Sequence, residues 1–212
     1  MIDMTNQPGQ KWPALFLAPA LFLALAAMTL SGCAENKSGA PFPANAVVAL
    51  SDQFTGDFNL VDKTGRPARD EDFADKIMFV YFGFTSCPDV CPGDIGAMSA
   101  ALNELGEDAS EIAPIFISVD PERDTPQVMG DYFEFDERII ALTGTEEAAR
   151  AARNSFKVVA QKEVLADSAL EYTINHQRFY FVTDRKGQPQ MAIVGGASPQ
   201  EIATVLRRSI NG

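Results

Sequence analysis

Two cysteines and one histidine are the residues whose types and spacing could support chemistry in this sequence. Cys87 and Cys91 lie three residues apart in the segment TSCPDVCP, which directly follows an apolar run. His176 is the only histidine among the 212 residues. Two thiolates and one imidazole would suit copper, as Cu(I) or as Cu(II). A zinc site usually has a fourth protein ligand, and the chain beyond residue 33 contains no further Cys or His.

A close pair of cysteines also has other uses. Near a helix N-terminus the thiols ionise readily, so a thiol–disulfide oxidoreductase is an alternative. Thioredoxin-type oxidoreductases place a cis-proline ahead of the strand that faces the dithiol, but no Pro occurs from Lys157 through Phe179, where His176 lies. This favours a metal site. A structural disulfide would close only a small loop and gain little entropy. A peroxidase with Cys87 as nucleophile and Arg123 as anion partner is a third alternative.

The elements that must position these residues alternate between strands and helices. Continuous apolar runs predict buried strands at 77–84 and 114–119, with further strands at 139–142, 156–163, 179–183 and 190–194. Helices are expected at 95–105, starting near Cys91, and at 126–135, 145–155 and 199–209. A turn signal at 63–67 after the segment 54–62 predicts an N-terminal β-hairpin. The expected class is α/β, a thioredoxin-like fold with a mixed central β-sheet flanked by helices.

The first 46 residues differ in character from the rest. An apolar run at 14–30 is too short to cross a bilayer comfortably, and it ends in the sequence LSGC at Cys33, which resembles a bacterial lipobox. We therefore expect a lipoprotein signal peptide at 1–32, a lipidated Cys33 followed by a flexible tether through residue 46, and one domain at 47–212. An uncleaved anchor helix is the alternative. Either arrangement places the domain in the cell envelope, on the periplasmic side of the membrane.

Charge excludes one class of partner. The chain has 17 basic and 29 acidic residues and a net charge of −12, so binding to a phosphate backbone is not expected. A charged loop contains Asp120, Glu122, Arg123 and Asp124 and is equally consistent with a docking surface and with a solvated turn. Met98 and Met129 stand at helical spacing among apolar neighbours, which favours core packing over metal ligation.

Three sequence blocks resemble the signatures of the Sco/SenC family of copper chaperones. They are FTSCPDVCP at 84–92, SVDPERDTP at 118–126, and YTINH at 172–176 with FYFVTD at 179–184. The resemblance spans residues 50–210. It implies a thioredoxin-like fold on a membrane anchor and one copper ion per chain, bound by Cys87, Cys91 and His176.

The same resemblance implies what the copper is for. It implies delivery of copper to the copper centre of cytochrome c oxidase subunit II during assembly, with other copper chaperones or thiol reductants as further partners. No bond is made or broken catalytically in such a role, so the chain would not be an enzyme, although oxidoreductase activity can coexist with copper binding. One residue departs from the family pattern: Asn175 stands before the histidine, where Asp is usual. If that Asp tunes the imidazole, copper affinity or redox behaviour should differ here.

Overall fold

The computed structural model describes residues 46–166 and 168–212. The expected signal peptide, Cys33 and all but the last residue of the tether lie outside the described residues. Within the part that is described, no helix is long and apolar enough to cross a membrane.

A mixed eight-stranded sheet forms the centre of the fold, in the order β1-β10-β9-β4-β5-β6-β2-β3. Strands β4, β5 and β6 are parallel to one another, and every other pairing in this sheet is antiparallel. The strands are β1 (Val47–Ala49), β2 (Asn59–Asp62), β3 (Pro67–Arg69), β4 (Ile77–Gly83), β5 (Ile112–Ser118), β6 (Ile140–Thr143), β9 (Phe179–Thr183) and β10 (Pro189–Val194). The expected mixed sheet is confirmed.

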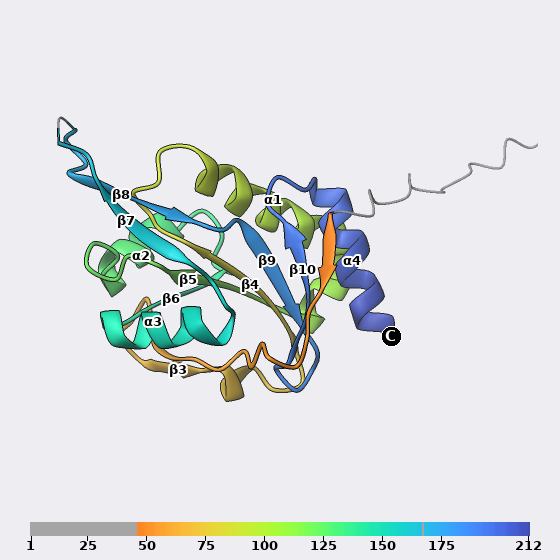
Figure 1. Cartoon of the computed structure of the whole chain (residues 1–212). Coiled ribbons are helices and arrows are strands. Elements are labelled where there is room, and N and C mark those ends of the chain that lie inside the picture. The colour runs from red at the N-terminus through yellow and green to blue at the C-terminus, as the bar shows by residue number, and fades with distance from the viewer. Residues whose placement is uncertain (1–45, 167) are drawn as a thin grey trace, which may run out of the picture. The chain divides into compact units, whose positions relative to one another are not determined.

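Helices cover both faces of this sheet, and strands β7 and β8 form a separate hairpin. The helices are α1 (Val90–Leu105), α2 (Pro126–Tyr132), α3 (Glu146–Ser155) and α4 (Pro199–Asn211). Figure 1 shows α1 beside α4 on one side of the sheet and α3 on the other. The remaining strands, β7 (Ala160–Val164) and β8 (Tyr172–His176), pair only with each other, with Ala160 opposite His176. Figure 1 shows this hairpin extending away from the central sheet.

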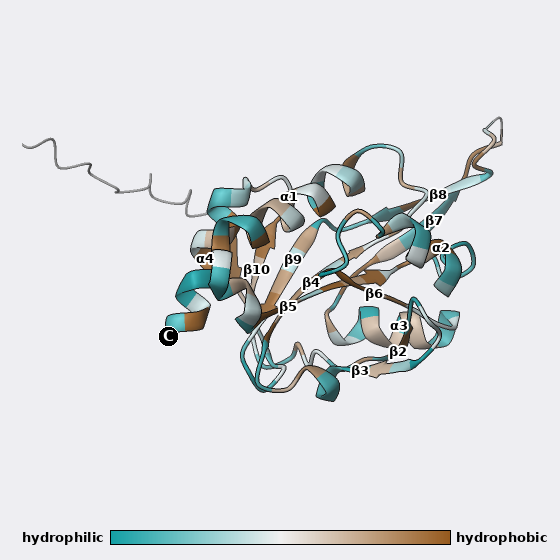
Figure 2. Ribbon diagram, turned by 180° about the vertical axis from the view of Figure 1, so that it is seen from behind, coloured by the Kyte–Doolittle hydropathy of each residue, from teal (hydrophilic) through white to brown (hydrophobic). Residues whose placement is uncertain are grey.

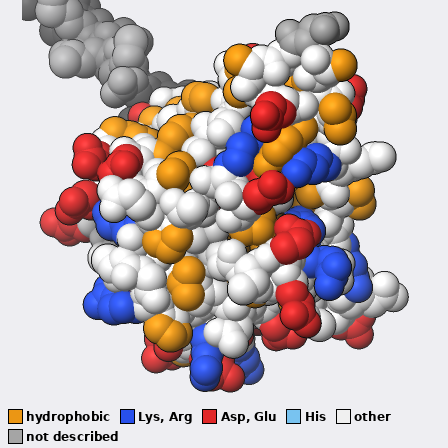
Figure 3. All heavy atoms as spheres, turned by 90° about the vertical axis from the view of Figure 1, so that its left-hand side faces the viewer, with side chains coloured by type: hydrophobic (Ala, Val, Ile, Leu, Met, Phe, Trp, Pro, Cys, Tyr) orange, Lys and Arg blue, Asp and Glu red, His pale blue; other side chains and the backbone are white. Residues whose placement is uncertain are grey.

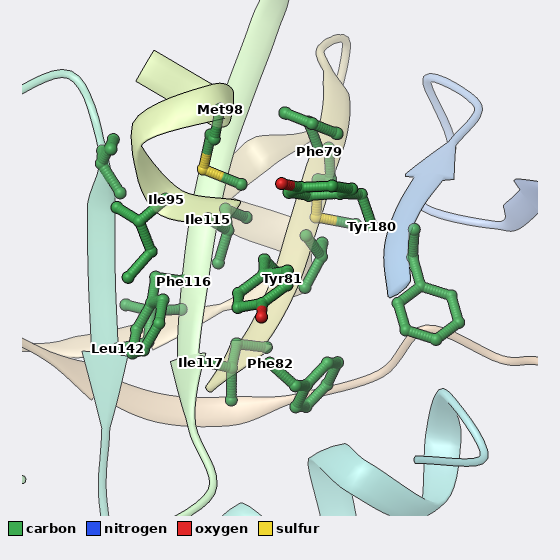
Figure 4. Close-up of a cluster of buried hydrophobic side chains, with 14 of the residues drawn as sticks. Phe79, Tyr81, Phe82, Ile95, Met98, Ile115, Phe116, Ile117, Leu142 and Tyr180 are labelled. Carbon is green, nitrogen blue, oxygen red and sulfur yellow. The ribbon is translucent and has the colours of Figure 1, made fainter. Parts of the chain in front are cut away.

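The core lies between the sheet and the helices. All seven residues of β4 and all seven of β5 are buried, as expected for parallel strands covered on both faces. Their side chains are mostly hydrophobic, which Figure 2 shows as brown central strands beneath helices with teal outer faces. In Figure 4 the aromatic rings of Phe79, Tyr81 and Tyr180 lie together, and Met98 of α1 points toward this cluster. Met98 and Met129 are both fully buried in the core, as their helical spacing predicts.

Helix starts follow the sequence closely. Thr125, Thr145 and Ser198 are the N-caps of α2, α3 and α4, and each side-chain oxygen accepts a hydrogen bond from a backbone N–H of the first turn. Helix α1 begins at Val90, so Cys91 lies in its first turn and Cys87 on the loop before it. The N-terminal hairpin is confirmed as the antiparallel pair β2–β3.

Several predicted boundaries are wrong. Helix α2 ends at Tyr132, three residues early, because the chain turns at Phe133, whose carbonyl accepts from Asp136 N–H. The strand expected from residue 156 begins only at Ala160, because the chain first turns out of α3 with Lys157 at φ 55°. Residues 54–58 form no strand ladder, and the strands β1 and β8 were not predicted.

Candidate metal centre

Cys87 and Cys91 lie where β4 leads into α1, at the carboxyl end of the parallel strands. Both are free thiols; Cys87 is 9% exposed and Cys91 is fully buried. The buried carboxylate of Asp124 holds the loop between β4 and α1 in place through Thr85. It accepts hydrogen bonds from the backbone N–H and the hydroxyl of Thr85, the latter at 2.6 Å, and from Ser118 Oγ at 2.6 Å. The position of Cys87 is therefore set by a residue of the second sequence block.

The two thiols differ strongly in acidity. The pKa of Cys87 is lowered to about 5, first because the Cys91 thiol donates a hydrogen bond to its sulfur. Backbone N–H groups of residues 89–91, at the start of α1, stabilise the same thiolate. The pKa of Cys91 is raised, because it supplies that hydrogen bond and because it is buried. At neutral pH the metal-free pair therefore carries one negative charge, on Cys87.

The imidazole of His176 meets the pair from the end of β8. Its Nε2 lies 3.5 Å from Cys91 Sγ, and its Nδ1 lies 3.0 Å from the carbonyl oxygen of Gln177. A carbonyl can only accept, so Nδ1 carries the proton and the Nε2 lone pair faces the sulfurs. Burial lowers the pKa of His176, which keeps the ring neutral at pH 7. The rings of Tyr81 and Phe84 approach the imidazole edge-on, with centroids 6.3 and 6.0 Å away.

The donors are in contact but are not already spaced for a metal ion. Within the described ranges, no group of three His, Cys, Asp or Glu side chains has the arrangement of a metal site. The 3.5 Å between Cys91 Sγ and His176 Nε2 is a hydrogen-bond distance. A metal ion would have to replace the thiol proton of Cys91 and draw in the Cys87 sulfur. The set of two thiolates and one neutral imidazole fits copper by the softness of its donors.

The charged loop of the second block contacts the hairpin that carries the histidine. The Arg123 guanidinium lies 3.8 Å from the ring centroid of Tyr172 on β8, and its Nη1 donates to the carbonyls of Leu170 and Tyr172. Asp120 binds both Arg123 and the Tyr172 hydroxyl. The ammonium group of Lys162 on β7 also lies against the Tyr172 ring, 3.6 Å from its centroid. These residues link the hairpin to the body, so the loop is not simply a solvated turn.

A second cluster, which sequence reasoning missed, surrounds Asp94 in the first turns of α1. The carboxylate is 2% exposed and accepts hydrogen bonds from the Tyr81 hydroxyl, from Nε and Nη2 of Arg178, each at 2.8 Å, and from Gly196 N–H. Tyr180 donates to the Asp94 backbone carbonyl at 2.7 Å. The only sequence signal for this cluster is that its members lie close in sequence to the candidate ligands. Asp94 is three residues from Cys91, and Arg178 is two residues from His176.

Asn175 does not contact the imidazole. Its side-chain amide points to the other face of the hairpin, where it donates to Glu163 at 2.6 Å. The group that orients the ring is instead the carbonyl of Gln177. Having Asn175 in place of Asp therefore does not affect the hydrogen bond that His176 Nδ1 donates to the Gln177 carbonyl.

Comparison with known proteins gives one consistent result. The family model described as SCO1/SenC matches residues 48–211. An SCO2-like protein of Rickettsia felis is 33% identical over 153 residues, which cover 72% of this chain and 75% of the relative. Protein sco1 of Schizosaccharomyces pombe is 34% identical over 195 residues, covering 88% of this chain and 74% of the relative.

Solved structures agree with the sequence relatives. The copper-bound ScoI of Bradyrhizobium japonicum superposes with a TM-score of 0.68 at 34% identity, covering 74% of this chain and 99% of that one. Copper-bound yeast Sco1 superposes with a TM-score of 0.69 at 26% identity, covering 75% of this chain and 89% of that one. The arrangement of sheet and helices described above is therefore shared with proteins that have been crystallised with copper.

Proposed function

The chain belongs to the SCO1/SenC family, and from that premise we propose that it is a copper chaperone for the assembly of cytochrome c oxidase. Copper is its cargo, one ion per chain, and the recipient is the copper centre of oxidase subunit II. The observation that carries the proposal is the contact between Cys91 and His176, residues 85 positions apart. The copper bound by the ScoI and Sco1 relatives supports it.

Cys87, Cys91 and His176 are the proposed ligands. Cys87 is already a thiolate at neutral pH, and the neutral imidazole presents its Nε2 lone pair toward the sulfurs. Copper binding then requires the loss of one further proton, from Cys91. Two thiolates suffice for Cu(I), while the added imidazole suits Cu(II), so this ligand set can hold either oxidation state.

Redox state would control loading. Copper capture needs both sulfurs as thiolates, because a Cys87–Cys91 disulfide has no free thiolate. Forming that disulfide removes one proton and two electrons from the metal-free pair, because Cys87 is already a thiolate, and so it needs a partner disulfide as the electron acceptor. A thiol reductant in the envelope would return the pair to the binding state. Metal loading is thereby coupled to the redox poise of the compartment.

Anaerobic copper titration of the reduced domain 47–212 tests the proposal. We expect one copper per chain in the wild type, and weakened or lost binding in Cys87→Ser, Cys91→Ser and His176→Ala. Both oxidation states should be titrated separately, since His176→Ala should weaken Cu(II) binding more than Cu(I) binding. Negligible copper affinity in the reduced wild type would overturn the proposal.

A thiol–disulfide oxidoreductase is the second candidate, and the low pKa of Cys87 beside the buried Cys91 favours it. In that role Cys87 attacks a partner disulfide and Cys91 resolves the mixed disulfide. Its substrates would be the cysteines of the oxidase or of another copper protein. Insulin reduction separates the two candidates: undiminished turnover by His176→Ala, together with negligible copper affinity in the wild type, would favour the oxidoreductase.

We also propose a location for the chaperone. Residues 1–32 are a lipoprotein signal peptide, Cys33 carries the lipid, and the tether through residue 46 holds the domain on the periplasmic side of the membrane. This placement suits a recipient that is itself a membrane protein, and it exposes the domain to other copper chaperones and thiol reductants. The support is the sequence LSGC after a short apolar run.

A further inference from the structure

His176 lies on a strand outside the central sheet, three residues before Phe179 of β9. Its strand β8 pairs only with β7, and this two-stranded sheet has no backbone ladder to the eight-stranded one. Cys91, by contrast, is fixed in the first turn of α1, which packs on the central sheet. Side-chain contacts therefore add to the short link to β9 in holding the imidazole against the sulfur.

Asp94 makes such a contact from the cysteine side. It lies on α1 one turn after Cys91, and its buried carboxylate binds Arg178 through two parallel hydrogen bonds of 2.8 Å. Arg178 follows His176 by two residues, where the chain leaves β8 and enters β9. A bidentate arginine–carboxylate pair fixes orientation as well as distance, because both groups are planar. The pair thus connects the helix that carries Cys91 to the segment that carries His176.

The same carboxylate also binds Tyr81, whose ring lies beside the imidazole. It accepts a hydrogen bond from the Tyr81 hydroxyl at 2.8 Å. The ring of Tyr81 lies edge-on to the imidazole. Asp94 therefore acts on both sides of the Cys91–His176 contact.

The turn after β10 packs against the backbone and Cβ of Arg178. Gly195 donates its N–H to the Arg178 carbonyl at 2.7 Å, and a Cβ at Gly195 would stand only 2.7 Å from Arg178 Cβ. Gly196 adopts φ 86° and donates to the Asp94 carboxylate at 3.0 Å. The turn after β10 thus packs directly against the ion pair.

We propose that Asp94 and Arg178 are positioning residues that hold His176 against Cys91 and so set the strength of its contribution to copper binding. The inference rests on the proposed function, since it concerns the third ligand of that site. Neither residue binds the metal. Partners of this kind, which hold a ligand in place, typically change metal affinity by about 10- to 100-fold when removed.

The test compares Asp94→Asn, His176→Ala and the double variant, with Cu(II) affinity measured by chelator competition. Asp94→Asn should weaken Cu(II) binding about tenfold and should reduce the nitrogen superhyperfine splitting in the Cu(II) electron paramagnetic resonance spectrum. Cu(I) affinity should fall by a smaller factor. In the double variant, Asp94→Asn should add no further loss to that of His176→Ala, because its effect passes through the imidazole.

Asp136→Asn is the matched control. Asp136 is also a buried carboxylate with a bidentate arginine, Arg138, and it also contacts α1, but at Ser99, away from the cysteines. Its loss should lower thermal stability without changing copper affinity or the resonance spectrum. If Asp94→Asn does not fold, Arg178→Lys takes its place, because lysine keeps the charge but not the bidentate geometry.

A metal-free readout completes the test. Since the chain has a single histidine, nuclear Overhauser contacts between its ring protons and those of Tyr81 are easily assigned, and Asp94→Asn should weaken them. Wild-type Cu(II) affinity in Asp94→Asn, or an equal loss with and without His176, would overturn the positioning role alone. No copper binding by the wild type would instead overturn the proposed function.

Discussion

Cys87 and Cys91 have the same side chain but opposite acidities, and the cause is local. Three backbone N–H groups at the start of α1 and the Cys91 thiol stabilise the Cys87 thiolate, while Cys91 lies deeper and has no comparable set of donors to stabilise a thiolate of its own. One thiolate and one thiol share a single proton between them. This asymmetry makes Cys87 the entry point for any electrophile, whether a metal ion or a disulfide.

Alkylation should reveal this order. With the reduced, metal-free domain at pH 6–7, iodoacetamide should modify Cys87 first and leave Cys91 protected, as read by peptide mass spectrometry. The rate at Cys87 should rise as the pH passes about 5 and then level off, because the reactive thiolate is by then fully formed. In Cys91→Ala the rate near pH 6 should drop, because the hydrogen-bond donor to the Cys87 sulfur is lost. Faster modification of Cys91 would contradict the assignment.

His176 should titrate below the ordinary histidine value. Burial disfavours the charged ring, so the midpoint of its proton resonances in the metal-free domain should lie below about 6.5. By linkage, the folded state loses stability relative to the unfolded chain as the pH falls below that ordinary value, because the unfolded chain binds the proton more readily. A nuclear magnetic resonance titration checks this directly, with the urea-unfolded chain as control. A midpoint at or above the unfolded value would be inconsistent with a half-buried, neutral imidazole.

Residue types alone were enough to indicate the candidate ligands but not the residues that hold them. Cysteine and histidine are rare here, so their chemistry stands out in the sequence. Asp94 and Arg178 are of types that usually lie on the surface, and nothing in a single sequence distinguishes a buried carboxylate from a solvated one. Their pairing depends on the approach of segments 84 positions apart. Such long-range contacts exist only in the folded chain.

At the scale of elements, the β7–β8 hairpin is the part whose stability depends most on side chains. It shares no backbone ladder with the central sheet, and two-stranded hairpins are marginal in water by themselves. The Tyr172 ring lies between the Arg123 guanidinium and the Lys162 ammonium, and Glu122 pairs with Lys162 at 2.7 Å. The second sequence block therefore contacts the histidine-bearing hairpin through several side chains.

Removing the arginine should loosen the hairpin. In Arg123→Ala the amides of 160–164 and 172–176 should exchange with deuterium about tenfold faster, since charge-assisted hydrogen bonds and the cation–π contact are each worth about 1 kcal/mol or more. Arg185→Ala is the control, because Arg185 also donates to a backbone carbonyl, that of Asp75, but far along the fold from the hairpin. Unchanged hairpin exchange in Arg123→Ala would show that other contacts hold it.

The elements that were predicted well are those with strong local signals. Buried runs such as 77–83 and capped helices such as 146–155 and 199–211 are encoded by neighbouring residues. Strand β8 was missed because its five residues include Thr173, Asn175 and His176, so only two apolar positions mark the alternation. Strand β1 has three residues and is defined by its partner β10. Short strands owe their existence to pairing rather than to propensity.

At the scale of the whole molecule, the site lies at the carboxyl end of the central strand β4. Charged side chains are distributed over the surface. Figure 3 shows the face formed by the hairpin, α2 and α3, where acidic and basic side chains are interspersed with hydrophobic ones. Several charged side chains of the domain are paired, as in Lys162–Glu122 and Arg153–Glu146. The net charge of −12 therefore predicts solubility and poor nucleic-acid binding, but it does not define a docking patch.

The remaining prediction concerns the attachment of the molecule to its membrane. If Cys33 is the lipidated residue after cleavage, the full-length chain expressed in a bacterial host should lose residues 1–32 and gain the mass of a lipid. Cys33→Ser should abolish that modification and leave a precursor of full length, because lipidation precedes cleavage in a lipoprotein signal. Intact-mass measurement of membrane and soluble fractions checks both outcomes, with Cys87→Ser as the matched cysteine control. An unmodified full-length chain in the membrane, in the wild type as in Cys33→Ser, would instead establish an uncleaved anchor; the domain would still face the envelope, but the tether would begin inside the bilayer.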